Sequence, residues 1–315
     1  MPTPIDIPNV EQAIGPYLPS ASSPLSITPI STGKFNTSFF ITGDQIRWVI
    51  RIAPPRDSVF IFYERDMMRQ EPGIHARLLE HTSVPVPQII AYDDSVAHIS
   101  RDFIIMERLP GKPISDVRCN YNSVLNQLGN FLARTHAVTA GTYGYIGEHH
   151  PMDPQTSWVD AFHIMWNLLI DGIVDVGHYD DEESGRFRTL LDRHITLFDR
   201  DVPSSLLHMD VWSENILVDD CSEVTGLIDW DRALWGDPEI EYAVLDYCGI
   251  SEPAFWEGYG RERDLSAEAR IRQVFYLLYE LQKYIIIRQG RGNDSARAKQ
   301  CKQQVFDILS RSELE

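Results

Sequence analysis

The chain has 315 residues, 43% of them hydrophobic, and carries a formal net charge of −18. This length exceeds one typical hydrophobic core and favours two compact units. The negative charge argues against nucleic acid as a partner, because phosphate backbones attract basic surfaces, and it favours a cationic ligand.

The spacing of the cysteines and the charges within the apolar runs indicate the cellular compartment of the protein. The four cysteines are widely spread and lack the spacing of a disulfide framework or a metal site. No signal-peptide pattern is found, and the longest apolar runs contain charged residues, which argues against a membrane span. We therefore expect a cytoplasmic protein without a membrane partner.

The first part of the chain predicts a strand-rich unit. Residues 1–25 are rich in proline and serine, and we expect them to form a loosely structured lead-in. Residues 39–42 and 46–52 are β-rich runs on either side of a Gly-Asp pair, as in a β-hairpin. Residues 103–109 predict a buried strand that ends at the breaker pair Pro110-Gly111.

Beyond residue 111 the pattern becomes helical. We expect helices over residues 121–138, 158–176, 267–288 and 295–311, where apolar residues recur at intervals of three and four. The acidic run at 180–183 is typical of a solvated loop.

Residues 206–231 carry the most specific chemical pattern. Asp210 is followed by Asn215 and then, after two short apolar runs separated by a turn, by Asp229. If these runs pair as a hairpin, Asn215 and Asp229 lie at the same end of it. Carboxylate and amide oxygens suit Mg²⁺, and Asp210 would then face an acceptor hydroxyl. The pattern predicts phosphoryl transfer from ATP, which needs divalent cations on the phosphates.

Three segments resemble the aminoglycoside phosphotransferase and choline kinase family of small-molecule kinases. They are H-M-D-V-W-S-E-N-I-L at 208–217, I-D-W-D at 228–231 and W-G-D-P at 235–238. The resemblance implies Asp210 as the catalytic residue and Asn215 and Asp229 as Mg²⁺ ligands. Met209 stands where the family usually has glycine, which tightens the space behind the catalytic loop.

The resemblance also implies an α+β fold that is bilobal and protein-kinase-like. A small N-terminal lobe with an antiparallel sheet, residues 1–108, would bind the nucleotide. A larger and mainly helical C-terminal lobe, residues 109–315, would carry the catalytic loop and the acceptor site.

Arg51 occupies the position of a family lysine or arginine that points from the third strand at the nucleotide phosphates. Its expected partner is a glutamate on the following helix, and Glu71 has the family spacing. A proline directly follows Glu71 and is disfavoured inside a helix, which leaves Glu64 as a competing partner.

Two further segments resemble nucleotide-binding parts of the family. The loop at 31–38 resembles the loop that covers the nucleotide, and 103–111 resembles the hinge between lobes, where backbone groups would bind adenine. The candidate residues in these segments are Gly33, Asn36, Met106, Glu107 and Leu109.

Other polar residues near the motifs are interpreted as structural. The family implies that His208 braces the catalytic loop and that His136 is a core or bracing histidine. We expect Asp231 to be solvated or to cap a helix, with a second metal-ligand role as the alternative. Asp237 precedes Pro238 in the order of a helix N-cap followed by its first residue.

We predict an ATP-dependent kinase that phosphorylates a hydroxyl of a small amine-bearing molecule such as an aminoglycoside. GTP could replace ATP, because backbone groups would recognise the base. One alternative is a catalytically silent, kinase-like nucleotide-binding module. Another is a metal-dependent phosphohydrolase that uses His208, Asp210 and Asp229. The sequence defines neither the acceptor nor the oligomeric state.

Overall fold

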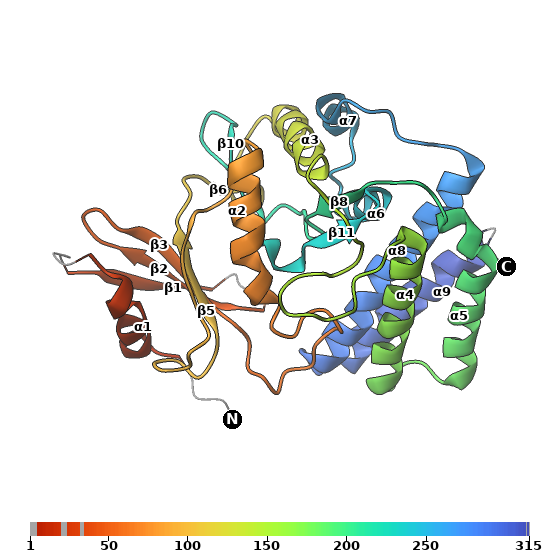
Figure 1. Ribbon diagram of the computed structural model, residues 1–315, viewed down its shortest axis with the longest axis horizontal. Helices are drawn as coiled ribbons and strands as arrows, with labels where there is room; N and C mark the ends of the chain where they lie inside the picture. The colour runs from red at the N-terminus through yellow and green to blue at the C-terminus, as the bar shows by residue number, and fades with distance from the viewer. Residues whose placement is uncertain (1–4, 20–23, 32–34, 313, 315) are drawn as a thin grey trace.

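A sheet-built lobe and a helical lobe lie side by side in the computed structural model (Figure 1). The structure describes residues 5–19, 24–31, 35–312 and 314. The bilobal α+β fold expected from the sequence is confirmed. The boundary proposed at residue 108 lies just after the last strand of the N-terminal sheet and stays a prediction.

The N-terminal lobe is built on an antiparallel sheet with the strand order β1-β2-β3-β5-β4. The strands are β1 Ser26–Ile30, β2 Thr37–Thr42, β3 Arg47–Ile52, β4 Ile89–Asp93 and β5 Phe103–Glu107. The predicted hairpin is β2–β3, in which Phe40 pairs with Val49. Its turn closes through a hydrogen bond of 2.9 Å from Gly43 N to Ile46 O.

A helix precedes the sheet and covers its outer face. α1 Ile7–Ile14 packs Val10 and Ala13 against the sheet core, and η1 Gly15–Tyr17 follows. The expected loose lead-in is therefore wrong for residues 7–17, because Asp6 and Asn9 form a capping box and the helix has an apolar face. Residues 1–4 and 20–23 of that lead-in lie outside the described residues.

The segment between β3 and α2 Glu71–His81 crosses from the sheet to the helical lobe. Ile61 and Tyr63 in this segment are buried in the core of the helical lobe. The chain then turns through η2 Met67–Gln70 into α2, whose proline lies in the first turn, where it is tolerated. The two lobes are thus joined by packed side chains as well as by the chain.

The four predicted helices of the C-terminal lobe are confirmed, with small shifts at their ends, as α3 Tyr121–His136, α4 Trp158–Asp175, α8 Ala267–Gly290 and α9 Ser295–Arg311. The structure adds α5 Asp181–His194, α6 Glu239–Tyr247 and α7 Pro253–Tyr259, for which no range was predicted. The prediction of a solvated loop at the acidic run 180–183 was wrong. Asp180 and Glu183 form a capping box, so the run begins α5. Acidic side chains also suit the positive end of the helix dipole.

Short strands and turns carry the motifs between these helices. They are β6 Lys112–Pro113, η3 Ile114–Asp116, β7 Thr139–Ala140, η4 Ile195–Phe198, β8 Ser204–Leu207, β9 Ile216–Val218, β10 Val224–Leu227, η5 Trp230–Arg232 and β11 Leu234–Gly236. The predicted hairpin after the catalytic loop is β9–β10, which pairs antiparallel and also contacts β6.

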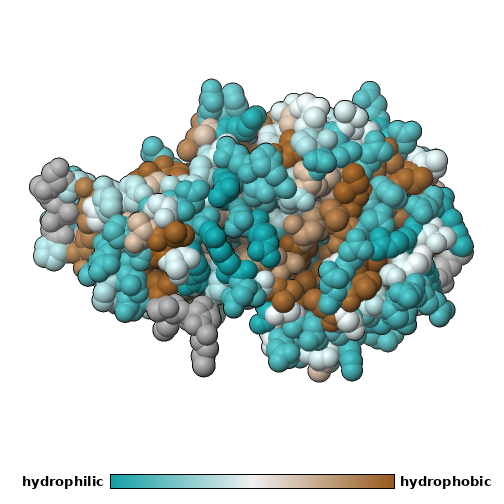
Figure 2. Space-filling model, turned by 60° about the horizontal axis from the view of Figure 1, so that its bottom comes forward, coloured by the Kyte–Doolittle hydropathy of each residue, from teal (hydrophilic) through white to brown (hydrophobic). Residues whose placement is uncertain are grey.

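Polar and apolar side chains are distributed unevenly on the surface. On the face in Figure 2, hydrophilic side chains gather where the lobes adjoin, and hydrophobic ones form bands over the helical lobe. None of the helices in the described ranges is long and apolar enough to cross a membrane.

Candidate active site

The catalytic loop runs from the end of β8 to the start of β9 and is braced by His208. This imidazole is fully buried, and its Nε2 lies 3.0 Å from Ile228 O while its Nδ1 lies 3.2 Å from Asp210 N. These partners fit a neutral ring with the proton on Nε2. Ile228 N donates to Asn215 O at 3.0 Å, so the loop and the residue before Asp229 are tied together twice.

Met209 has a left-handed backbone with φ of 63°, a conformation that glycine adopts more readily than other residues. Its side chain is buried in the core of the helical lobe, and its N donates to Glu241 Oε1 at 2.6 Å. Glu241 also bonds His136 Nε2 at 2.6 Å, which gives His136 the bracing contact expected of it. Packing of the Met209 side chain and the hydrogen bond to the buried Glu241 carboxylate therefore hold this backbone conformation, where the resembling family usually has glycine.

Asp210 is oriented by two donors. Arg232 NH1 lies 3.1 Å from Asp210 Oδ1, and Asn215 Nδ2 lies 3.2 Å from Asp210 Oδ2. Asn215 Nδ2 also donates to Asp210 O at 2.9 Å. The carboxylate therefore has a fixed direction.

Asp229 leaves β10 with a left-handed backbone, φ 71°, and forms an ion pair with Arg51 across the lobes. About a third of its side chain, 34%, is exposed. Burial of its inner part tends to raise the pKa of Asp229, but Arg51 and Arg232 hold that pKa below its usual range. The group is therefore an anion at neutral pH.

Arg51 pairs with Glu71, and Glu64 lies elsewhere. Arg51 NH1 lies 2.9 and 2.7 Å from the two carboxylate oxygens of Glu71, and NH2 lies 2.9 Å from Asp231 Oδ2. Burial opposes the charge of Arg51, but Asp229 and Glu71 outweigh it and raise its pKa. Burial also raises the pKa of Glu71 to about 7, which the attraction of Arg51 only partly offsets.

The structure corrects the prediction made for Asp231. The sequence suggested a solvated or capping carboxylate, yet Asp231 is buried and accepts from Asn36 Nδ2 at 3.3 Å as well as from Arg51. The residues after Asp229 form η5, which packs beneath the N-terminal lobe, where Gln70 Nε2 donates to Asp231 O at 2.6 Å. Burial and the neighbouring Asp229 raise the pKa of Asp231 well above its usual range.

The predicted hinge lies at the end of β5. Met106 is buried against Met68 on the inner face of the sheet. Glu107 is exposed, and its N donates to Gln88 O at 2.9 Å. Leu109 lies against β10, where a Cβ on Gly226 would approach Leu109 Cδ1 to 2.9 Å. Gly33, predicted in the covering loop, lies outside the described residues.

Asp237 also differs in detail from its prediction. α6 begins at Glu239 with Pro238 at the N-cap, one residue later than expected. Asp237 Oδ1 still accepts from Glu239 N at 3.0 Å, and Oδ2 lies 3.4 Å from Arg200 NH2. Its structural interpretation fits these contacts.

The residues proposed for Mg²⁺ offer suitable donors. Asn215 uses Nδ2 to donate to Asp210, which leaves Oδ1 as its acceptor atom, and Asp229 is anionic and partly exposed. Mg²⁺ prefers such oxygen ligands and takes few of them from protein when phosphates supply others. The two residues therefore fit the ion that the resemblance implies.

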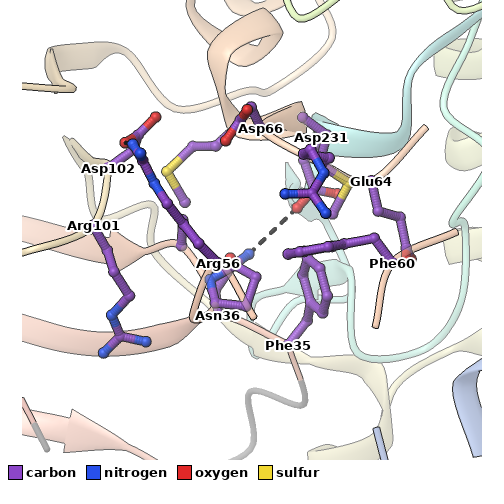
Figure 3. Close-up of a pocket in the computed structure, with 14 residues that line it drawn as sticks. Phe35, Asn36, Arg56, Phe60, Glu64, Asp66, Arg101, Asp102 and Asp231 are labelled. Atoms are coloured by element: carbon purple, nitrogen blue, oxygen red, sulfur yellow. Dashed lines mark hydrogen bonds and ion pairs between the residues drawn. The ribbon is translucent and has the colours of Figure 1, made fainter. Parts of the chain in front are cut away.

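A small pocket opens beside Asp231 (Figure 3). Phe35 and Asn36 from the segment before β2 line it together with Phe60, Glu64 and Asp231. Figure 3 shows the hydrogen bond between Asn36 and Asp231 at its inner end. The pocket lies where the segment before β2 meets the η5 turn.

Sequence reasoning missed Arg232 as a neighbour of Asp210 and Glu64 as a neighbour of Arg232. Arg232 comes two residues after the I-D-W motif, so its position close to Asp229 was the signal. No local pattern marked Glu64, because its arginine partners are remote in the sequence.

A family model described as the phosphotransferase enzyme family matches residues 26–274. A probable ketoamine kinase of Vibrio parahaemolyticus is 25% identical over 268 residues, which cover 80% of this chain and 83% of that protein. Hygromycin-B 4-O-kinase of Escherichia coli is 25% identical over 232 residues, covering 69% of this chain and 64% of that protein.

Solved structures share the fold. A putative fructosamine-3-kinase of Haemophilus somnus superposes with a TM-score of 0.69 at 18% identity and covers 96% of both chains. Aminoglycoside phosphotransferase APH(4)-Ia superposes with a TM-score of 0.64 at 20% identity and covers 98% of this chain and 100% of that one.

Proposed function

Because this chain belongs to the phosphotransferase enzyme family and is a small-molecule kinase, we propose that it transfers the γ-phosphoryl group of ATP to a hydroxyl of an amine-bearing sugar. One observation carries the proposal: Asp210, Asn215 and Asp229 gather at the end of one hairpin beneath Arg51. The cation of Arg51 comes from the sheet-built lobe and the carboxylates from the helical lobe. Such an arrangement suits a charged substrate held between lobes.

We assign Arg51 to the nucleotide phosphates and Asn215 and Asp229 to Mg²⁺. Bound Mg²⁺ would neutralise the charge that develops on the phosphoryl group. Arg51 presents a planar fork, and Glu71 fixes one side of that fork through NH1. The other side, NH2, contacts Asp229 and Asp231, so it lies beside the proposed metal ligands.

Asp210 orients the acceptor hydroxyl and receives its proton late in the transfer. Its two oxygens already accept hydrogen bonds from Arg232 and Asn215, which makes the carboxylate well directed. Phosphoryl transfer through a loose transition state needs little base strength and depends chiefly on position. Closure of the lobes would exclude water and limit hydrolysis of ATP.

Two observations support an amine-bearing sugar as the acceptor. The relatives named above are a probable ketoamine kinase and a hygromycin-B 4-O-kinase, whose names give a ketoamine and hygromycin B as the molecules phosphorylated. The formal net charge of −18 would attract cationic molecules over a distance. GTP remains a competing donor, since backbone groups at the hinge would recognise the base.

The test is ATP and GTP turnover across aminoglycosides, ketoamines, amino sugars, choline and homoserine. We expect phosphorylation of at least one amine-bearing sugar, and a fall of about 1,000-fold or more in kcat for Asp210→Asn with nucleotide affinity retained. Turnover at full rate in Asp210→Asn would remove Asp210 from the mechanism. Nucleotide binding without any acceptor would instead favour the silent module, and phosphate release from phosphoesters without ATP would favour the phosphohydrolase.

A further inference from the structure

Glu64 lies at the centre of a buried charge cluster between the lobes. Its side chain is fully buried, and Oε2 accepts hydrogen bonds from Ile61 N, at 2.8 Å, and from Arg291. Among the described residues Oε1 has no hydrogen-bond partner, and it faces Arg232 NH2 at 3.6 Å. A buried carboxylate is costly unless cations compensate it, so the two arginines account for its burial.

Arg232 joins this cluster to the catalytic loop. Its guanidinium directs NH1 to Asp210 Oδ1, at 3.1 Å, and NH2 toward Glu64. Burial opposes the charge of Arg232, but Asp210 and Glu64 are among the groups that raise its pKa. A planar guanidinium that is held at two corners has one orientation. Without Glu64, the carboxylates of the proposed metal site would compete for the Arg232 guanidinium.

Arg291 joins the same cluster to Phe35, in the segment before β2. Its guanidinium lies 4.1 Å from the centroid of the Phe35 ring, and Phe35 meets Phe60 edge to face at 6.1 Å. Figure 3 shows Phe35, Phe60, Glu64 and Asp231 around one side of the pocket. Glu64 therefore contacts both Arg291, which lies against Phe35, and Arg232, which lies beside Asp210.

We propose that Glu64 is a positioning residue for phosphoryl transfer, which holds the Arg232 guanidinium against Asp210. The proposal rests on the proposed function, in which Asp210 directs the acceptor hydroxyl. Glu64 touches no substrate and exchanges no proton. It holds the Arg232 guanidinium, which in turn donates to the Asp210 carboxylate and sets its position. A displacement of that carboxylate by about 1 Å is enough to slow a reaction about 100-fold.

The test compares Glu64→Gln with Glu64→Asp. Gln keeps the shape but removes the charge that holds Arg232, so we expect kcat to fall about 10- to 100-fold with little change in the KM for ATP. Asp keeps the charge and should recover most of kcat. In an Arg232→Met background, Glu64→Gln should cause no further loss, because the two residues act as one unit.

Glu239 provides a matched control. It is another buried carboxylate shared by two arginines, with Arg200 NH1 at 2.6 Å and Arg272 Nε at 2.7 Å. Glu239→Gln should lower thermal stability without lowering kcat. An equal fall in kcat for Glu239→Gln and Glu64→Gln, or full additivity with Arg232→Met, would show that Glu64 is merely structural and would overturn the proposal.

A second measurement does not depend on turnover. In protein labelled with ¹⁵N-arginine, the Nε–H signal of Arg232, assigned through Arg232→Lys, should be ordered in the natural chain and in Glu64→Asp but mobile in Glu64→Gln. An equally ordered Arg232 in Glu64→Gln overturns the proposal whatever the activity. Failure of the whole acceptor panel with a mobile Arg232 would instead count against the proposed function, and the link from Glu64 to Arg232 would stand.

Discussion

Arg51 contacts three carboxylates that come from both lobes, Glu71, Asp229 and Asp231. Arg51→Ala would leave the buried Glu71 and Asp231 without their cation, so we expect a loss of about 3–5 kcal/mol of unfolding free energy and weaker binding of a non-hydrolysable ATP analogue. Arg51→Lys keeps the charge but cannot form the fork, and both losses should be smaller. Urea unfolding and calorimetric titration measure them. Unchanged stability and affinity in Arg51→Ala would contradict the assignment.

His75 gives a prediction about pH. This ring is buried, its Nδ1 lies 2.7 Å from Pro87 O, and burial lowers its pKa to about 4 from 6.5. The unfolded chain therefore binds a proton at His75 before the folded chain does. The resulting contribution to stability is present above pH 6.5 and is lost as pH falls toward 4.

His75→Asn keeps a donor toward Pro87 O but cannot take up this proton. The fall in unfolding free energy between pH 6.5 and 4 should be shallower in the variant than in the natural chain, by about 3 kcal/mol at most. Other titrating groups are common to both proteins and cancel in the difference. Parallel pH profiles from urea unfolding would show that His75 is not buried as a neutral ring.

The sequence could group Asp210, Asn215 and Asp229 because one short hairpin joins them, and hairpins have a local signature. Their catalytic and metal-binding roles stay predictions. The burial of Asp231 could not be foreseen, since its partner Asn36 lies 195 residues earlier. The pairing of Glu64 with arginines is likewise a tertiary contact that leaves no periodic pattern in the chain.

At the scale of elements, α3 and α7 pack so closely that glycine is required between them. A Cβ on Gly129 would lie 2.1 Å from Phe255 O, and one on Gly258 would lie 1.8 Å from Asn126 O. Gly129→Ala should therefore lower the unfolding free energy by about 1–3 kcal/mol, because the backbone of α7 has to move.

Gly185 in α5 is the matched control, since nothing lies within 4 Å of its added Cβ. Gly185→Ala should raise stability by up to about 1 kcal/mol, as expected inside a helix. Both values come from denaturant unfolding. A neutral Gly129→Ala would mean that the two helices are not in close contact.

Helix prediction succeeded where apolar periodicity was long, as in α8 and α9. It failed for α1 and for the start of α5 because composition was weighed above capping: Asp6 with Asn9, and Asp180 with Glu183, are reciprocal caps. Each cap is a short pattern, and the residues around it are of types that usually suggest a loop. Proline- or acid-rich stretches are thus compatible with a helix start when such a cap is present.

At the scale of the molecule, the lobes share a core through the segment after β3. Ile61 is buried in the helical lobe although it belongs to the connection from the sheet. Ile61→Ala should lower the unfolding free energy by about 2–5 kcal/mol, and the chain should still unfold in one cooperative transition. Ile90, which is 39% exposed in β4, is the control, and its substitution by Ala should change little. Two separate transitions in the natural chain would contradict shared packing.

The helical lobe fixes the shape of the catalytic loop from behind. Met209 has a backbone conformation that suits glycine, and its side chain fills part of the lobe's interior. A loop transplanted from a relative with glycine there would leave an unfilled hole among the buried side chains of the helical lobe. Exchange of acceptor specificity between relatives by loop grafting must therefore carry the surrounding interior residues with it.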